Sequence, residues 1–361
     1  MKTLIDNALS KDNEGIQNGT DGASDQELAE LLEGLKTNIY IVGLGGAGCN
    51  TIDRISEEGI QGAKLIAGNT DAQHLLSVDA DRKVLLGRNT TRGLGAGAKP
   101  EVGKKACEEA LDDIKDIIQE PDIVFLTCGM GGGTGTGSII PVAEYSKKIG
   151  ALTIAIVTKP FSSEGRSRMK NAAWGIKNIS HFADTVITVE NDKLLEIAPR
   201  LSLNNAFKLA DEILMYSIKG MTELVSKPGL VNLDYNDLRT VMDSSGHAVI
   251  GMGESTGRGD IRAKEAIEKA INSPLINADI TGANGALLNI TGGSDMSVRE
   301  AETVVEEIER MVNPDAKIIW GCNVDPALKD KMRVMVVATG IKRKLKRPDA
   351  EESEENIKNV Y

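Results

Sequence analysis

The stretch Gly131-Gly132-Gly133-Thr134-Gly135-Thr136-Gly137 decides how the rest of the sequence is interpreted. It follows an apolar run over residues 122–128 that is typical of a buried strand, and a helical pattern follows it. Successive glycine N–H groups can form an anion-binding concavity, and the helix dipole adds positive potential there. The threonine hydroxyls can bond to phosphate oxygens or cap the helix. The stretch therefore predicts a phosphate-binding loop between a strand and a helix.

A second glycine-rich stretch, Gly43-Leu44-Gly45-Gly46-Ala47-Gly48, lies between another strand pattern and another helix pattern. It fits the GxGxxG dinucleotide fingerprint, and Asp71 stands roughly twenty positions further on. Taken alone, it would suggest an NAD-dependent oxidoreductase or a glycine turn that binds nothing. A dinucleotide enzyme has no use for a second phosphate cradle, and we find no candidate hydride-transfer residues. The absence of a Walker A GxxxxGK[ST] pattern excludes a P-loop NTPase as a motif match.

Length and composition fit a two-domain protein of a reducing compartment. The 361 residues carry a net charge of -11 that is spread along the chain, which argues against a general nucleic-acid binder. The four cysteines (Cys49, Cys107, Cys128 and Cys322) form no CxxC pair, so neither a metal site nor disulfides are expected. No apolar run approaches the roughly 18–20 residues of a membrane span, so direct membrane insertion is not expected.

Short apolar strand patterns alternate with helical patterns from residue 38 onward, which predicts an α/β fold with a parallel sheet covered on both faces. Residues 203–226 predict one long helix that is apolar around much of its girth and therefore buried on more than one side. We expect five parts: an N-terminal extension (1–36), a Rossmann-like nucleotide-binding domain (37–202), the central helix (203–226), a second, smaller α/β domain (227–340) and a flexible charged tail (341–361).

The glycine loops and their neighbours resemble those of the FtsZ/tubulin superfamily of GTPases. GGGTGTG is similar to the signature of that superfamily. The segments 45–50, 69–73, 93–97, 159–168 and 191–195 resemble, in order and spacing, the loops that surround the nucleotide in FtsZ. The resemblance covers about residues 38 to 340, and it is closer to FtsZ than to eukaryotic tubulin.

The resemblance implies that the chain binds GTP or GDP with Mg²⁺. Asn50, Asn191 and Asp211 would read the guanine, since a carboxylate can accept from its N1–H and exocyclic amine whereas adenine offers no donor at N1. The residues implied around the nucleotide are Gly46, Ala47, Gly48, Cys49, Asn50, Asp71, Ala96, Gly97, Gly133, Thr134, Gly135, Thr136, Gly137, Glu164, Arg168, Asn191, Phe207 and Asp211, with Phe207 stacked on the base and Asp71 and Gln73 near the metal.

Several of these residues also have an ordinary structural interpretation. Phe207 on a helical stripe could belong to the core, and Asp211 could be an exposed helix charge. Glu164 and Arg168 could form a surface ion pair. The three histidines, His74, His181 and His247, have no matched partners in the sequence and receive no role.

Residues 232–237, Asn-Leu-Asp-Tyr-Asn-Asp, resemble the synergy loop of the family, Asn-x-Asp-x-x-Asp. Asp234 and Asp237 would ordinarily cap a helix. In the family this loop meets the nucleotide of the neighbouring subunit, which makes Asn232, Asp234 and Asp237 the candidate catalytic residues. Two carboxylates can orient and polarise the attacking water of phosphoryl transfer.

The resemblance implies an assembly-stimulated GTPase that converts GTP and water to GDP and phosphate. Its subunits would join head-to-tail, a contact that propagates into protofilaments. The implied location is cytoplasmic, in a cytokinetic ring at mid-cell. A tubulin-like filament that controls cell shape is the alternative. The expected partners are further copies of the chain and membrane-anchoring or regulatory division proteins, bound through the tail or the N-terminal extension.

Overall fold

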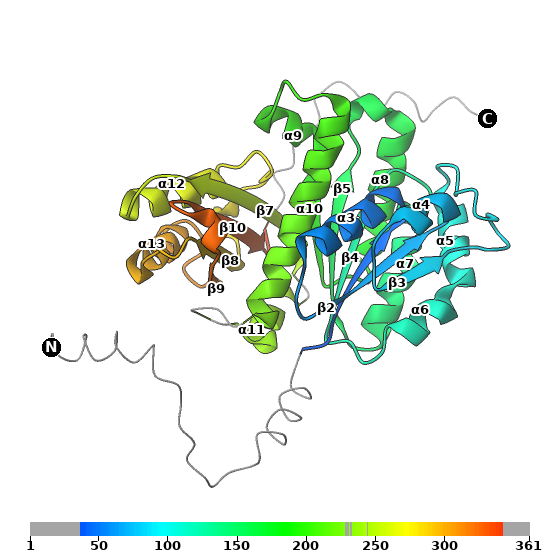
Figure 1. Cartoon of the computed structure of the whole chain (residues 1–361), viewed down its shortest axis with the longest axis horizontal. Coiled ribbons are helices and arrows are strands. Elements are labelled where there is room, and N and C mark those ends of the chain that lie inside the picture. The colour runs from blue at the N-terminus through cyan, green and yellow to red at the C-terminus, as the bar shows by residue number, and fades with distance from the viewer. Residues whose placement is uncertain (1–36, 228–230, 232, 244, 342–361) are drawn as a thin grey trace, which may run out of the picture. The chain divides into compact units, whose positions relative to one another are not determined.

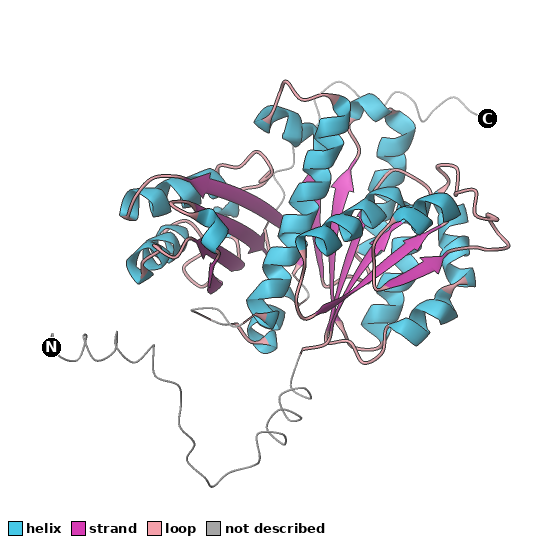
Figure 2. Cartoon of the chain, in the orientation of Figure 1, coloured by secondary structure: helices cyan, strands magenta, loops and turns pink. Residues whose placement is uncertain are grey.

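The computed structural model describes residues 37–227, 231, 233–243 and 245–341. The N-terminal extension, the charged tail after Ile341 and the candidate catalytic residue Asn232 lie outside the described residues. The described part is an α/β body with one continuous sheet (Figures 1 and 2). None of its helices combines the length and the apolar character needed to cross a lipid bilayer.

The first part of the sheet is entirely parallel. Its strands, in spatial order, are β3 (Arg82–Leu85), β2 (Ala63–Asn69), β1 (Ile39–Leu44), β4 (Ile123–Gly129), β5 (Leu152–Lys159) and β6 (Thr185–Glu190). The chain builds outward from β1 to β3 on one side and then returns to place β4 on the other. Such a reversal leaves a crevice at the carboxyl ends of the two strands, where ligands of open parallel sheets bind.

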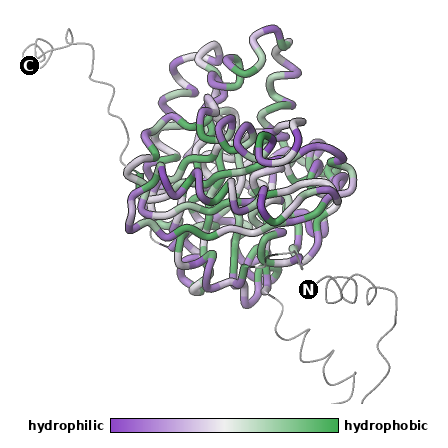
Figure 3. The backbone as a smooth tube through the Cα atoms, turned by 90° about the vertical axis from the view of Figure 1, so that its left-hand side faces the viewer, coloured by the Kyte–Doolittle hydropathy of each residue, from purple (hydrophilic) through white to green (hydrophobic). Residues whose placement is uncertain are grey.

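Helices cover both faces of this parallel region, because successive side chains along β1 point to opposite faces of the sheet and are buried on both. Ile39 and Ile41 face one core, and Tyr40, Val42 and Leu44 face the other. The first core contains α3 (Gly45–Glu58), α4 (Ala72–Ser77), α9 (Asn191–Ile197) and α10 (Leu203–Ser226); the second contains α5 (Pro100–Glu109), α6 (Leu111–Ile117), α7 (Thr134–Lys148) and α8 (Arg166–Ile179). Figure 3 shows the hydrophobic segments running through the interior.

An apolar stripe at helical spacing favours a single helix from Pro100 to Ile117, but this segment is divided in two. Ala110, between α5 and α6, has φ -100° and ψ 11°, and its N–H bonds to the Cys107 carbonyl three residues back. This tighter turn redirects the chain, yet Ala106, Ala110 and Ile114 all remain buried in one core. The apolar stripe thus marks the buried face of both helices, although the helix itself is not continuous.

The second part of the sheet is mixed. β7 (Gly246–Ser255) extends the parallel region by pairing with β6 over residues 246–248 and then pairs antiparallel with β10. The order continues through β10 (Met332–Thr339), β8 (Gly285–Gly292) and β9 (Lys317–Val324), and α12 (Asp260–Ile271) and α13 (Val298–Glu309) pack on one face. The pair β10–β8 is antiparallel and β8–β9 is parallel, which gives a ten-stranded sheet.

The long helix α10 spans the range expected from the sequence and contacts both parts of the sheet. On β10, Met335 and Val337 belong to the core that contains α10, whereas Val334 and Val336 belong to the core of α12 and α13. The burial of α10 on more than one side is therefore confirmed. One hydrophobic core runs through both parts of the body.

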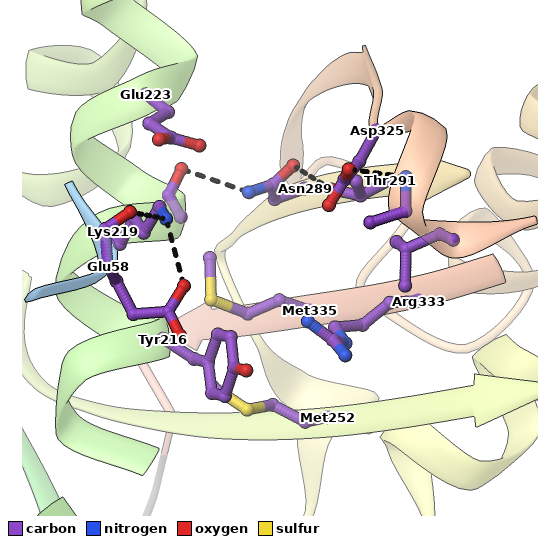
Figure 4. Close-up of a pocket in the computed structure, with 13 residues that line it drawn as sticks. Glu58, Tyr216, Lys219, Glu223, Met252, Asn289, Thr291, Asp325, Arg333 and Met335 are labelled. Atoms are coloured by element: carbon purple, nitrogen blue, oxygen red, sulfur yellow. Dashed lines mark hydrogen bonds and ion pairs between the residues drawn. The ribbon is translucent and has the colours of Figure 1, made fainter. Parts of the chain in front are cut away.

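A cavity of about 290 Å³ lies where α10 faces β7, β8 and β10 (Figure 4). Gly220 allows the close approach, because a Cβ there would lie 2.9 Å from Nδ2 of Asn289 and from Cε of Met335. Asn289 Nδ2 donates to the Gly220 carbonyl at 3.0 Å. On the other side, Lys219 donates to the carbonyl of Glu58 at 3.3 Å, which ties α10 to the end of α3.

Candidate functional site

A second cavity, of about 270 Å³, opens at the point where the chain order reverses between β1 and β4. Its walls come from the starts of α3 and α7, the segments that follow β4, β5 and β6, and the first half of α10. It therefore has the position that the sheet topology predicts for a ligand. The sequence-predicted residues that line it are Gly46, Ala47, Gly133, Thr134, Gly135, Glu164, Arg168, Asn191, Phe207 and Asp211.

The two glycine loops touch at the floor of this cavity. A Cβ added to Gly45 would lie 2.7 Å from the backbone nitrogen of Gly135, so the loops could not approach so closely with larger residues. A Cβ at Gly46 or Gly132 would meet nothing within 4 Å, because both face open space in the cavity. Each loop leads into a helix, α3 or α7, whose N-terminus favours a bound anion. The floor of the cavity thus suits a chain of phosphates.

Four predicted residues lie behind the cavity wall. The Thr136 hydroxyl accepts a hydrogen bond from the Gly131 N–H at 2.8 Å and so fixes the loop. A Cβ at Gly137 would lie 2.0 Å from the Pro100 carbonyl, and one at Gly48 would lie 2.5 Å from the Thr127 carbonyl. The Cys49 side chain is fully buried in the core. These residues allow close packing and do not line the cavity.

Ala96 and Gly97 also lie outside the cavity lining. Ala96 is buried against the glycine loop, since a Cβ at Gly133 would lie 2.9 Å from the Ala96 Cβ. Gly97 has a φ of +56°, in the left-handed region that favours glycine. The segment therefore supports the loop at Gly133 from outside.

The far end of the cavity offers hydrogen-bond acceptors. Asp211 is 8% exposed, and burial raises the pKa of its carboxyl to about 6, against the opposing effects of the Arg54 guanidinium and a hydrogen bond from Asn50. Asn191 is buried, and its Oδ1 has no hydrogen-bond partner among the described residues. Buried acceptors of this kind suit a base that presents N–H donors.

Phe207 stands beside these acceptors. The residue is 37% exposed, and its ring packs edge-to-face against that of buried Phe161, with the ring centroids 5.2 Å apart. This position leaves the ring available to stack on a planar base at the cavity. Phe207 therefore packs with the core only where its ring contacts Phe161.

Glu164 and Arg168 form the ion pair that was the ordinary alternative for them. Arg168 Nη1 lies 2.5 Å from Glu164 Oε2, and Glu164 Oε1 accepts from the Phe161 N–H at 2.8 Å. Both residues nevertheless line the cavity. The half-exposed guanidinium lies close enough to its rim to meet an anionic ligand.

Asp71 and Gln73 lie beside the cavity and do not line it. Asp71 caps α4, since its Oδ1 accepts from the N–H groups of Gln73 and His74 at 3.0 and 3.1 Å. The described residues contain no cluster of three or more His, Cys, Asp or Glu that could hold a metal alone. The second carboxylate oxygen of Asp71 and the amide oxygen of Gln73 are ligands of the type that Mg²⁺ takes together with waters and phosphates.

Asp234 and Asp237 form a capping box at the start of α11 (Tyr235–Met242). Asp234 Oδ1 accepts from the Asp237 N–H at 2.8 Å, and Asp237 Oδ2 accepts from the Asp234 N–H at 3.3 Å. Both residues are exposed. The ordinary interpretation of these acids as helix caps is therefore observed, and it leaves their remaining oxygens toward solvent.

The two acids lie far from the cavity of their own chain. Asp211 is in the first half of α10, whereas Asp234 follows the other end of that helix, at Ser226 (Figure 1). At about 1.5 Å per residue, the helix alone separates these points by about 22 Å. The structure thus does not bring the candidate catalytic acids together with the candidate nucleotide-binding residues.

The sequence reasoning missed several residues around the cavity. Met130, directly after β4, and Thr158, near the end of β5, line it. Their position at the carboxyl ends of parallel strands was the signal that could have identified them. Arg54 and His74 were also missed; they contact Asp211 and Asn50, respectively.

Comparisons with known proteins agree with this geometry. The model of the Tubulin/FtsZ family GTPase domain matches residues 38–199, and that of the FtsZ family C-terminal domain matches residues 246–342. The chain is 49% identical over 346 residues to Cell division protein FtsZ 1 of Archaeoglobus fulgidus, covering 95% of this chain and 94% of that one. It is 53% identical over 318 residues to Cell division protein FtsZ of Haloferax mediterranei, with coverage of 88% and 84%.

A solved structure, the empty FtsZ dimer of M. jannaschii, has a TM-score of 0.85 with this chain at 46% identity, covering 94% of this chain and all of that one. Both the fold class and the suspected family are thereby confirmed. With the match extending over both parts of the sheet, the chain belongs to the FtsZ family of the tubulin/FtsZ superfamily.

Proposed function

We propose that this chain binds GTP in the cavity between β1 and β4, polymerises head-to-tail, and hydrolyses the nucleotide where two subunits meet. The observation that carries the proposal is the separation of the cavity from Asp234 and Asp237 along α10. The membership of the FtsZ family supports the GTPase activity and the role in cell division. The resulting filament would form the ring at the division site.

The cavity would hold the nucleotide along its length. The glycine loops at Gly46 and Gly133 would bind the phosphates through backbone N–H groups, with Arg168 at the rim. Asp211 and Asn191 would accept the donors of guanine, and Phe207 would stack on the base. GTP is preferred over ATP in this arrangement, because adenine would leave the buried Asp211 carboxylate without a donor.

Asp71 and Gln73 would hold Mg²⁺ beside the phosphates, where the bound ion neutralises part of their negative charge. The Asp71 side chain remains anchored as the cap of α4 through its other oxygen. A hydrogen bond between the hydroxyls of Thr70 and Thr134, at 2.6 Å, keeps this loop against the second glycine loop.

The exposed acids at α11 would act on the nucleotide of the next subunit. In a head-to-tail contact, Asp234 and Asp237 can orient and polarise the attacking water from the opposite side of the phosphates. A single subunit would then bind GTP and hydrolyse it poorly. Hydrolysis would depend on assembly, and assembly would continue as a filament because the contact is not self-closing.

Assembly assays test this proposal directly. Light scattering and negative-stain microscopy with GTP and Mg²⁺ should show filaments, while ATP should not support them. The GTPase rate should be near zero below a critical protein concentration. A rate that is linear in protein concentration from the lowest dilution would mean that one subunit carries a complete site.

Mixing two inactive variants gives a sharper test of the shared site. Asp234→Ala keeps its own cavity. Gly46→Leu places a side chain in the cavity, where a Cβ at this position meets no atom within 4 Å, and keeps an intact Asp234. Where the cavity of the first variant meets the α11 acids of the second, one complete site forms. The mixture should therefore recover GTPase activity that neither variant shows alone at the same total protein concentration.

The division of the chain into an N-terminal extension, a GTP-binding domain, a central helix, an activation domain and a tail remains part of this proposal. The extension and the tail are its candidate sites for membrane-anchoring or regulatory partners. The relatives are named as cell division proteins, which favours division over control of cell shape. Imaging a tagged copy during its depletion tests this choice: a mid-cell ring and failed division are expected.

A further inference from the structure

A chain of hydrogen bonds joins the loop after β2 to the base end of the nucleotide cavity. The Asp71 N–H donates to Asn69 Oδ1 at 3.2 Å, and Asn69 Nδ2 lies 3.0 Å from His74 Nδ1. His74 Nε2 lies 2.9 Å from Asn50 Oδ1. The Asn50 side chain in turn interacts with the Asp211 carboxyl, and this contact lowers the pKa of Asp211 against the effect of burial. The chain therefore connects three elements, α4, α3 and α10.

The backbone N–H of Asp71 sets the direction of the bonds in this chain. A backbone N–H can only donate, so Oδ1 of Asn69 must face Asp71, and its Nδ2 must face His74. The His74 Nδ1 then accepts, which places the ring proton on Nε2, where it donates to Asn50 Oδ1. The Asn50 amide is left with its NH₂ group toward Asp211. A carboxylate requires this orientation, because it can only accept.

We propose that His74 is a positioning residue for guanine recognition, a role that rests on the proposed function of Asp211. His74 holds the Asn50 amide in the one orientation that supports the ionised Asp211 carboxylate. Without this contact, the amide can turn over and place its oxygen against that carboxylate. Asp211 would then be repelled from the position in which it accepts both guanine donors.

The surroundings explain why Asn50 needs such a contact. Asn69 and Asp211 are buried, whereas Asn50 is exposed on the second turn of α3, where water competes for its hydrogen bonds. The backbone of His74 is fixed independently of its ring, since its N–H is capped by Asp71 and the adjacent Leu75 is buried. A substitution at His74 therefore removes the ring contacts and keeps the cap of α4.

The test compares the affinities for GDP and ADP, which report on the base without driving hydrolysis. His74→Leu should weaken GDP binding by about tenfold, the scale of one lost hydrogen bond to a charged network, and leave ADP binding unchanged. His74→Phe, which keeps a ring, should do the same. The matched control is His181→Leu, at an exposed position outside this chain of bonds, with no expected effect.

Two further variants separate positioning from a merely structural effect. His74→Gln should retain most of the GDP affinity that His74→Leu loses. Its amide presents an acceptor and a donor two bonds apart, as the imidazole does. In an Asn50→Ala background, His74→Leu should cause no further loss of GDP affinity, since the group that it positions is gone. A full additional loss in this double variant would overturn the proposal.

The outcomes separate this inference from the proposed function. If the unmodified chain binds GDP and ADP equally, guanine recognition by Asp211 fails, and the role of His74 fails with it. If the chain prefers GDP and His74→Leu keeps the same preference, only the inference about His74 is wrong. An equal loss of GDP and ADP affinity in both His74→Leu and His74→Phe would indicate damage to the loop and would overturn the inference too.

Discussion

Oδ2 of Asp211 on α10 lies 4.0 Å from the guanidinium Nε of Arg54 on α3, and burial nevertheless raises the pKa of that carboxyl to about 6. The same guanidinium lies 3.6 Å from Glu212, so its charge is shared between two acids. The Asp211 carboxylate is therefore only partly compensated until a ligand supplies donors. This relationship leads to two predictions about pH.

The first concerns the pH dependence of nucleotide binding. The ionised Asp211 accepts the guanine donors, so GDP affinity should fall by about tenfold for each pH unit below 6. Calorimetry from pH 5 to 8 measures this. The Asp211→Asn variant is the control, because its GDP affinity should be lower at pH 8 and should lack this part of the decline. An identical pH profile in both proteins would contradict the role of Asp211.

The second concerns stability without nucleotide. The pKa of Asp211 is raised from 3.8 to about 6 in the native state, so the native protein binds more protons between these values and loses stability as the pH rises through them. Asp211→Asn should therefore raise the free energy of unfolding at pH 7.5 by roughly 2–3 kcal/mol and have little effect at pH 4. Urea unfolding at both values checks this. An equal gain at both would point to another cause.

The capping box of α11 allows helix stability and hydrolysis to be separated. Asp234→Ala removes both the cap and the carboxylate and should cost about 1 kcal/mol of unfolding free energy. Asp234→Asn should keep the stability, since asparagine caps as well as aspartate does. Both variants should bind GTP normally and lose most of the hydrolysis. If Asp234→Asn retains the full GTPase rate, the acid acts only as a helix cap.

Two glycines of α3 should respond oppositely to alanine. Gly48→Ala should destabilise the fold by about 1–3 kcal/mol, because its Cβ would lie 2.5 Å from the Thr127 carbonyl. Gly46→Ala meets no atom within 4 Å and should raise helix stability by up to about 1 kcal/mol, while its methyl group enters the cavity and weakens GDP binding. Thermal unfolding and a binding titration on both variants distinguish packing from ligand contact.

The sequence predicted the buried strands and missed both edges of the sheet. The apolar strand patterns in the sequence do not include residues 82–85 and 317–324, which form β3 and β9, the first and last strands in the spatial order. On β3 only Val84 is fully buried, and much of β9 is partly exposed. An edge strand packs against one neighbour, so its apolar pattern is weaker than that of a central strand. Interior strands such as β4, buried on both faces, gave a continuous apolar signal.

The part of the site that is formed by backbone groups was predictable from the sequence. Glycine loops after two strands fixed the place of the cavity, since local sequence determines such turns. The contact between His74 and Asn50 was not predictable, because these residues are 24 positions apart on separate elements. The same holds for Arg54 and Asp211, which meet only when α10 packs against α3. Side chains that meet only through tertiary packing produce no motif or periodic pattern in the sequence.

The place of β10 in the sheet has a consequence for synthesis of the chain. Among the described strands it is the last to be translated, yet it lies between β7 and β8. Until residues 332–339 leave the ribosome, those two strands have no partner between them, and the side of α10 that Met335 and Val337 will cover stays open to water. A nascent chain that stalls before this point exposes unpaired strand edges and apolar surface, both of which promote aggregation.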